Sequence, residues 1–161
     1  MFDLSFSFAE AILREVDTSE RDTLLLRLKD EWRVGPAQFW FPIAISGDEN
    51  RPAHTEAFQA LAFEEELTTE TFRKILFDHQ VEKAFELRES DDICEIELSQ
   101  LYPIYTGLEG MWFTSQLDWL VYASHESSVT VGGKWLLPAV KAAWPNWEKR
   151  IYTTPFYERT L

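Results

Sequence analysis

The first third of the chain has the hydrophobic spacing of two amphipathic helices. Residues 7–10 have the form of a capping box, with a hydroxyl first and a carboxylate three residues later. A short helix through about residue 16 is therefore expected. A second helix is expected from about 18 to 32, where leucines recur at three- and four-residue spacing.

The next segments combine one extended stretch with further helices. Residues 37–46 are mostly apolar and read as extended and largely buried, although Pro42 limits them to an edge strand or to no strand. The stretch 54–67 favours a helix by propensity. Thr68 or Thr69 can then cap another helix.

The hydrophobic period changes to two in the second half of the chain. Residues 84–89 and 93–99 alternate between apolar and polar positions, and the polar residues 90–92 separate them. This pattern predicts a β-hairpin. Residues 111–113 form a short candidate strand.

The clearest strand signal lies in residues 118–125, and residues 129–131 form the strand after it. Because both faces of this pair are mostly apolar, we expect it to be central in the sheet and covered on both sides. A two-residue turn around Ser127 would set the register. It would place on one face Leu120, Tyr122, Val129 and Val131, and on the other Trp119, Val121, Ala123, His125 and Thr130.

Helices first and strands afterwards predict an α+β fold rather than alternating α/β units. We expect an antiparallel sheet of about four to six strands from the C-terminal half, packed by N-terminal helices. Pro138 suits the first turn of a closing C-terminal helix. With 161 residues, the chain is expected to form a single domain, 1–161.

The composition limits the classes of protein that the chain can belong to. Of all residues 45% are hydrophobic and seven are Trp, which is enough to build a core. Cys94 is the only cysteine, so neither an intramolecular disulfide nor a zinc framework is expected. The N-terminus lacks the basic region of a signal peptide, and a cytoplasmic location is the expectation. No cofactor and no metal are expected.

Negative charge is concentrated in one part of the sequence. The net charge is −13, and residues 48–97 contain 15 acidic against five basic residues. Such a chain repels phosphate backbones, so nucleic-acid binding is not expected, and no stretch is apolar enough to expect membrane insertion. A basic protein would be attracted instead, although acidic residues can also serve solubility alone. The candidate partner-binding acids are Glu64, Glu65, Glu66, Asp91 and Asp92.

The sequence contains none of the common catalytic fingerprints, such as a phosphate-binding loop or a His-Glu-x-x-His helix. His125 and Glu126 are the most suggestive pair, with His125 as a candidate general base. Adjacent strand residues point to opposite faces, so Glu126 is not expected to orient His125, and Asp118 has the parity of Glu126. The alternative is that His125 only shapes the turn.

Trp144 and Trp147 lie three residues apart and flank Pro145. If exposed, the two indoles would form a joint aromatic surface for a partner or for a homodimer. The alternative is that they pack in the core.

The small size, acidity, Trp content and absence of catalytic motifs resemble small acidic bacterial immunity proteins of polymorphic toxin systems. The stretch Asp118 to Trp135, with the paired Gly132 and Gly133, is similar in style to the SUKH-like group. This resemblance implies an α+β fold whose acidic surface masks a basic toxin, often a nuclease. It assigns a role to no individual residue.

The sequence is therefore compatible with two functions. The first is a non-enzymatic acidic domain that binds and masks a basic protein. The alternative is a small enzyme or ligand-binding domain with a pocket near His125, beside Tyr122 and Trp119.

Overall fold

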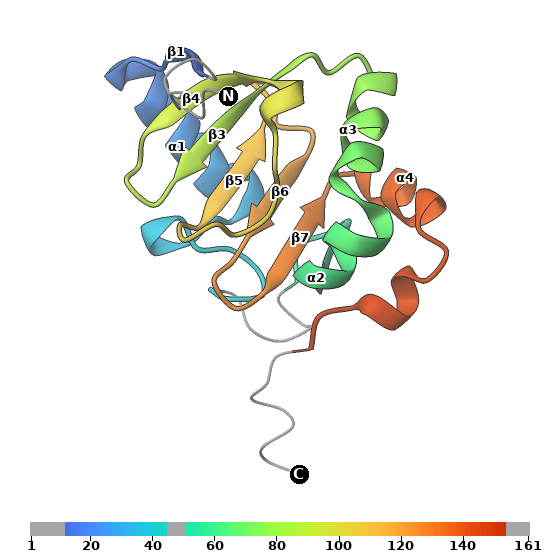
Figure 1. The fold of residues 1–161 in the computed structure, drawn as a ribbon. Helices are drawn as coiled ribbons and strands as arrows, with labels where there is room; N and C mark the ends of the chain where they lie inside the picture. The colour runs from blue at the N-terminus through green and yellow to red at the C-terminus, as the bar shows by residue number, and fades with distance from the viewer. Residues whose placement is uncertain (1–11, 45–50, 154–161) are drawn as a thin grey trace, which may run out of the picture.

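A computed structural model describes residues 12–44 and 51–153. Seven strands form one antiparallel sheet in the order β1-β4-β3-β5-β6-β7-β2 (Figure 1). Their bounds are Ile12–Glu15 (β1), Thr55–Gln59 (β2), Lys83–Arg88 (β3), Ile93–Glu97 (β4), Gly110–Phe113 (β5), Leu120–Ala123 (β6) and Ser128–Gly132 (β7). The predicted α+β class and antiparallel sheet are confirmed.

Helices cover both faces of the sheet. Helix α1 (Thr18–Trp32) crosses one face, whereas α3 (Thr69–Asp78) and α4 (Leu136–Ala143) lie on the other (Figure 1). A short helix α2 (Ala60–Ala62) continues into a π-helical turn, Phe63–Leu67, on the side of α3 and α4. Short 3-10 turns comprise Pro36–Gln38, Leu98–Gln100 and Trp147–Arg150.

Local capping explains where the two longest helices begin. The Asp17 side chain accepts a hydrogen bond of 2.8 Å from the backbone N–H of Glu20, so α1 starts at Thr18. The Thr68 hydroxyl accepts from the N–H of Thr71 at 3.2 Å and caps α3. Both starts agree with the sequence prediction.

Two strands occupy segments for which the sequence predicts helix, and this is why the sheet exceeds the expected number of strands. Residues 12–15 pair with β4, whereas the predicted capping box at 7–10 lies outside the described residues. Residues 55–59 pair with β7 along their whole length, and four of the five are buried. In β2, ladder hydrogen bonds and burial outweigh the weak helix propensity, whereas the four residues of β1 are exposed and the strand depends on its pairing with β4.

The segment expected to be extended at 37–46 forms turns as far as the structure describes it, to residue 44. Its predicted burial is confirmed for Trp40 and Phe41. The Phe41 carbonyl accepts a hydrogen bond of 2.7 Å from the Thr130 hydroxyl, which fastens the segment to the α1 face of the sheet.

The predicted burial of β6 and β7 on both faces is confirmed, and both are interior strands, but the predicted register is wrong by one residue. Val121 lies opposite Val131, and Ala123 lies opposite Val129, so these four share the face covered by α3 and α4. The reason is the turn, which has three residues, 125–127, and closes through a Ser124 N–H to Ser128 carbonyl bond of 3.0 Å. A one-residue change in turn length moves every side chain to the opposite face.

Two hydrophobic cores result, one on each face of the sheet. The first contains Trp112, Trp119 and Trp144 beneath α3 and α4. The second contains Leu28, Trp40 and other apolar residues beneath α1. Among the described helices, none has the length and apolarity needed to cross a membrane.

Gly132 illustrates how tightly the second core is packed. A Cβ atom at this position would lie 2.7 Å from a ring carbon of Trp32 and 2.9 Å from one of Trp40. We predict that Gly132→Ala lowers the free energy of unfolding by about 1–3 kcal/mol, because these indoles must shift. Urea unfolding measures this, and the exposed Ala142→Ser serves as a control within about 0.5 kcal/mol of wild type. Equal stability of the two variants would contradict the packing described.

Candidate functional site

Three loops meet at one end of the sheet. The register places the end of β3, the start of β4, the start of β5, the end of β6 and the start of β7 at this end. The β3–β4 turn, the loop before β5 and the β6–β7 turn therefore lie side by side. They contribute the carboxylates of Glu89, Asp91, Asp92, Glu109 and Glu126, and we call this group the acidic end.

Few cations balance the acidic end. Arg88 is the nearest basic residue in the sequence, and its guanidinium pairs with Glu86 at 2.6 Å. Among the described residues, no Lys or Arg lies within 4.0 Å of a carboxylate of Glu89, Asp91 or Asp92. These three residues are exposed, so the end projects uncompensated negative charge toward solvent.

Hydrogen bonds within the loops fix the positions of the acidic side chains. The Gln38 amide donates to Asp91 at 3.0 Å, and Glu89 accepts from the backbone N–H of Glu109 at 2.8 Å. The second bond links the β3–β4 turn to the loop before β5. These bonds hold the side chains of Asp91 and Glu89 in defined positions at the acidic end.

Glu109 is the buried member of the group, with only 4% of its surface exposed. One of its carboxylate oxygens accepts from the Tyr122 hydroxyl. The other accepts from the His125 backbone N–H at 3.1 Å and contacts the Nδ1 atom of the same residue. A buried carboxylate needs such donors, because burial without them is strongly unfavourable.

His125 lies between two carboxylates. Its Nδ1 atom contacts Glu109, and its Nε2 atom lies 3.2 Å from an oxygen of Glu126. The expectation that Glu126 does not orient His125 is wrong, because both residues belong to the turn rather than to a strand. The alternation of side chains across a strand does not apply there.

The pKa of His125 is raised above its ordinary value of 6.5. The largest cause is the hydrogen bond to Glu109, and the charges of Glu109, Glu126 and Glu89 add to it, whereas partial burial opposes it. The pKa of Tyr122 is also raised, by burial and by Glu109, so its hydroxyl stays protonated as a donor.

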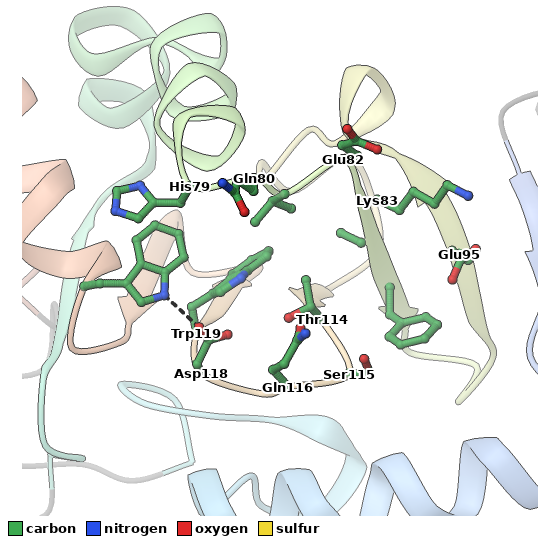
Figure 2. Close-up of a pocket in the computed structure, with 14 residues that line it drawn as sticks. His79, Gln80, Glu82, Lys83, Glu95, Thr114, Ser115, Gln116, Asp118 and Trp119 are labelled. Atoms are coloured by element: carbon green, nitrogen blue, oxygen red, sulfur yellow. Dashed lines mark hydrogen bonds between the residues drawn. The ribbon is translucent and has the colours of Figure 1, made fainter.

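Asp118 lies at the opposite end of β6, away from His125 and Glu126. It accepts a hydrogen bond of 2.8 Å from the Trp135 indole and borders a cleft of about 610 Å³ (Figure 2). Gln80, Thr114 and Gln116 also line this cleft, between the end of α3 and the β5–β6 loop. The structure therefore separates Asp118 from the other two candidate catalytic residues.

The residues expected to share a pocket with His125 do not do so. Tyr122 packs in the core beneath α1, and Trp119 packs in the core on the opposite face. The His125 side chain is 44% exposed, and it does not line the cleft beside Asp118. His125 therefore lies at the protein surface.

The cluster Glu64–Glu66 lies in the layer of helices, and two of its members have internal partners. Tyr102 donates to Glu64 at 2.6 Å, and Arg150 pairs with Glu66 at 2.8 Å. Glu65 is exposed. The described acids of residues 48–97 therefore do not form one surface. Some lie in this layer, some at the acidic end and others on strands, such as Glu56 in β2, Glu86 in β3 and Glu95 in β4. Asp48 and Glu49 lie outside the described residues.

Trp144 and Trp147 do not form a joint exposed surface. Trp144 is 2% exposed and packs against Phe58 and Phe63, so the interpretation as a core residue is confirmed. Trp147 is half-buried, with the Lys141 ammonium 4.0 Å from its ring centre. Trp144 is buried in the core because α4, which directly precedes it, packs against the sheet.

Sequence reasoning missed Glu109 and Glu89 as members of the site. Neither belongs to a motif, and Glu109 is separated from His125 by 15 residues. A signal was present, since a hairpin pairing 111–113 with 118–125 brings residue 109 near residue 125. Within the described residues, no group of three or more His, Cys, Asp or Glu is placed to hold a metal ion.

Comparisons with known proteins add no family to this description. No protein-family model, no curated protein and no solved structure matches the chain.

The His125 pairing predicts a pH-dependent contribution to stability. Because the folded pKa is raised, the contribution is complete below pH 6.5 and is lost as the pH rises through the folded pKa. His125→Gln should therefore destabilise the protein most in acid solution, and the difference from wild type should shrink toward alkaline pH. Thermal unfolding across this range measures the difference, with His54→Gln as the control. A difference that does not change with pH would contradict the imidazolium pairing.

Proposed function

We propose that the protein is a non-enzymatic binding domain that docks a basic protein on the acidic end of its sheet. The observation that carries the proposal is the set of exposed carboxylates at Glu89, Asp91 and Asp92, which have no Lys or Arg partner among the described residues. Because such charges gain little from the fold itself, an external cation is the partner that they fit.

The charges of this surface are accompanied by exposed apolar groups. Leu108, directly before Glu109, is 49% exposed, and Tyr105 in the same loop is 37% exposed. Protein interfaces combine apolar contact with a charged rim, and aromatic side chains are enriched in them. A protein surface that carries Lys or Arg beside apolar residues would match this combination.

Electrostatic attraction of this kind acts mainly on the rate of association. Exposed charges are screened over about 8 Å at physiological ionic strength, so association should slow steeply with added salt. The resemblance to small acidic immunity proteins suggests a toxin as the basic partner, and masking that partner would require no catalytic group.

The proposal is tested by capturing the partner at a defined position. A photo-crosslinking residue is placed at the exposed Ser90, between the acids of the β3–β4 turn, and a second version places it at the exposed Leu26 of α1. In lysate of the source cell, we expect a basic protein to crosslink at 90 but not at 26. High salt should abolish the crosslink.

Matched charge variants of the unmodified chain then test the same partner in purified form. We predict that Asp91→Asn with Asp92→Asn slows association by about tenfold at low salt, since two charges near the contact are lost. Asn tolerates the left-handed backbone of residue 91, where φ is 65°, so the turn should persist. Stopped-flow or biolayer interferometry measures the rate.

The control removes two charges elsewhere. Glu70→Gln with Glu97→Gln has the same net charge as the first double variant and should leave the association rate within about twofold of wild type. Glu65→Gln, in the Glu64–Glu66 cluster, should likewise leave the association rate within about twofold of wild type. Equal slowing by both double variants would show dependence on net charge alone and would overturn the proposed docking surface.

A further inference from the structure

We propose that His125 makes the acidic end a pH-sensitive docking surface, which binds a basic partner more tightly once the imidazole has lost its proton. The inference rests on the proposed function and adds its regulation. It starts from the fact that both ring nitrogens face carboxylates, Glu109 at Nδ1 and Glu126 at Nε2.

Only the protonated ring satisfies both carboxylates. An imidazolium donates from both nitrogens, whereas a neutral imidazole has one donor and one acceptor. The neutral ring must therefore turn a lone pair toward either Glu109 or Glu126. In a neutral ring, one of the two contacts becomes repulsive.

Burial decides which contact is lost. Glu109 is 4% exposed and is held by the Tyr122 hydroxyl and the His125 backbone N–H, so it cannot turn to solvent. The Glu126 side chain is 48% exposed and can do so at little cost. The neutral ring consequently keeps its N–H on Glu109 and releases Glu126.

Loss of the proton changes the surface in two ways that favour a cation. The acidic end becomes more negative by one charge, and the Glu126 carboxylate no longer has an internal partner. Either change strengthens attraction to a basic partner at short range. Affinity and stability should therefore respond to pH in opposite directions.

The other groups that face His125 come from several elements. The charge of Glu89, which follows β3, acts on the His125 ring. Tyr122 donates its hydroxyl to Glu109, which contacts His125. The Phe39 ring lies edge-on to the His125 ring, with 6.2 Å between the ring centres. Tyr152 lies near Glu126, and burial raises its pKa. Both tyrosines remain neutral, so His125 is the group that titrates. Its raised pKa places the transition above pH 6.5.

A decalysine peptide is a suitable probe, because its ammonium groups stay protonated up to about pH 9. Fluorescence anisotropy with the full chain at constant ionic strength gives its Kd between about pH 6 and pH 8.5. We expect affinity to rise by about two- to fivefold across the transition for wild type. His54→Gln and His79→Gln should show the same rise.

Two variants separate this inference from its alternatives. His125→Gln is neutral throughout this pH range and should remove the rise in affinity with pH. Glu126→Gln keeps the His125–Glu109 contact and should make the rise in affinity smaller. A rise that persists in His125→Gln, or a flat wild-type profile, would overturn the inference. Glu126→Gln keeps the test decisive if His125→Gln does not fold.

Failure of the proposed function has a different signature. Asp91→Asn with Asp92→Asn should weaken decalysine binding at every pH and preserve the rise. If that double variant binds as wild type does while the rise remains, the docking surface is wrong but the titration is right. If decalysine does not bind at all, both are wrong.

Discussion

Burial of β5, β6 and β7 on both faces is the constraint on which the rest of the structure depends. All 13 residues of these strands are buried, so neither face can meet water. One helical layer must cover each face, and the two hydrophobic cores follow from this requirement. Charged side chains are then excluded from these three strands and lie on the other strands, the helices and the loops. The polar residues Ser128 and Thr130 of β7 are buried with hydrogen-bond partners.

This constraint also explains why a buried carboxylate lies at one end. Glu109 directly precedes β5, and its side chain is enclosed by the neighbouring strand ends. It is stabilised there because β6 supplies the Tyr122 hydroxyl and the following turn supplies two nitrogens of His125. The same contacts that satisfy Glu109 hold the turn in place, so one buried acid orders two loops of the acidic end.

The sequence predicts those parts of the fold in which local pattern and tertiary packing agree. Alternation predicts β3 and β4, a run of apolar residues predicts β6, leucine spacing predicts α1, and the threonines at 68 and 69 predict the start of α3. The sequence pattern does not predict β1 and β2. Their short segments have helix propensity and become strands only because they pair with distant residues. The register of β6 and β7 depends on whether their turn has two or three residues, and serines permit either length.

The candidate site was predictable to the same extent. Asp91 and Asp92 were predicted in a turn, and His125 and Glu126 at the tip of a strand, but their proximity is a property of strand order. Sequence alone does not fix that order, since β3 could have paired with other strands. Glu109 could not be recognised from its own sequence context, because nothing local distinguishes a buried carboxylate from a solvated one.

The two acidic clusters differ in a way that follows from their surroundings. Glu66 lies beside the basic C-terminal segment, and there Arg150 and the Trp144 indole supply donors that lower the pKa of its carboxyl. The loops at the acidic end face no comparable segment within the described residues. Glu66 holds the helical layer to the C-terminal turn, whereas Glu89, Asp91 and Asp92 form no ion pair with a Lys or Arg of the described residues. These exposed carboxylates therefore lack the stabilising ion pair that Glu66 has, and the proposed docking of a basic protein would supply one.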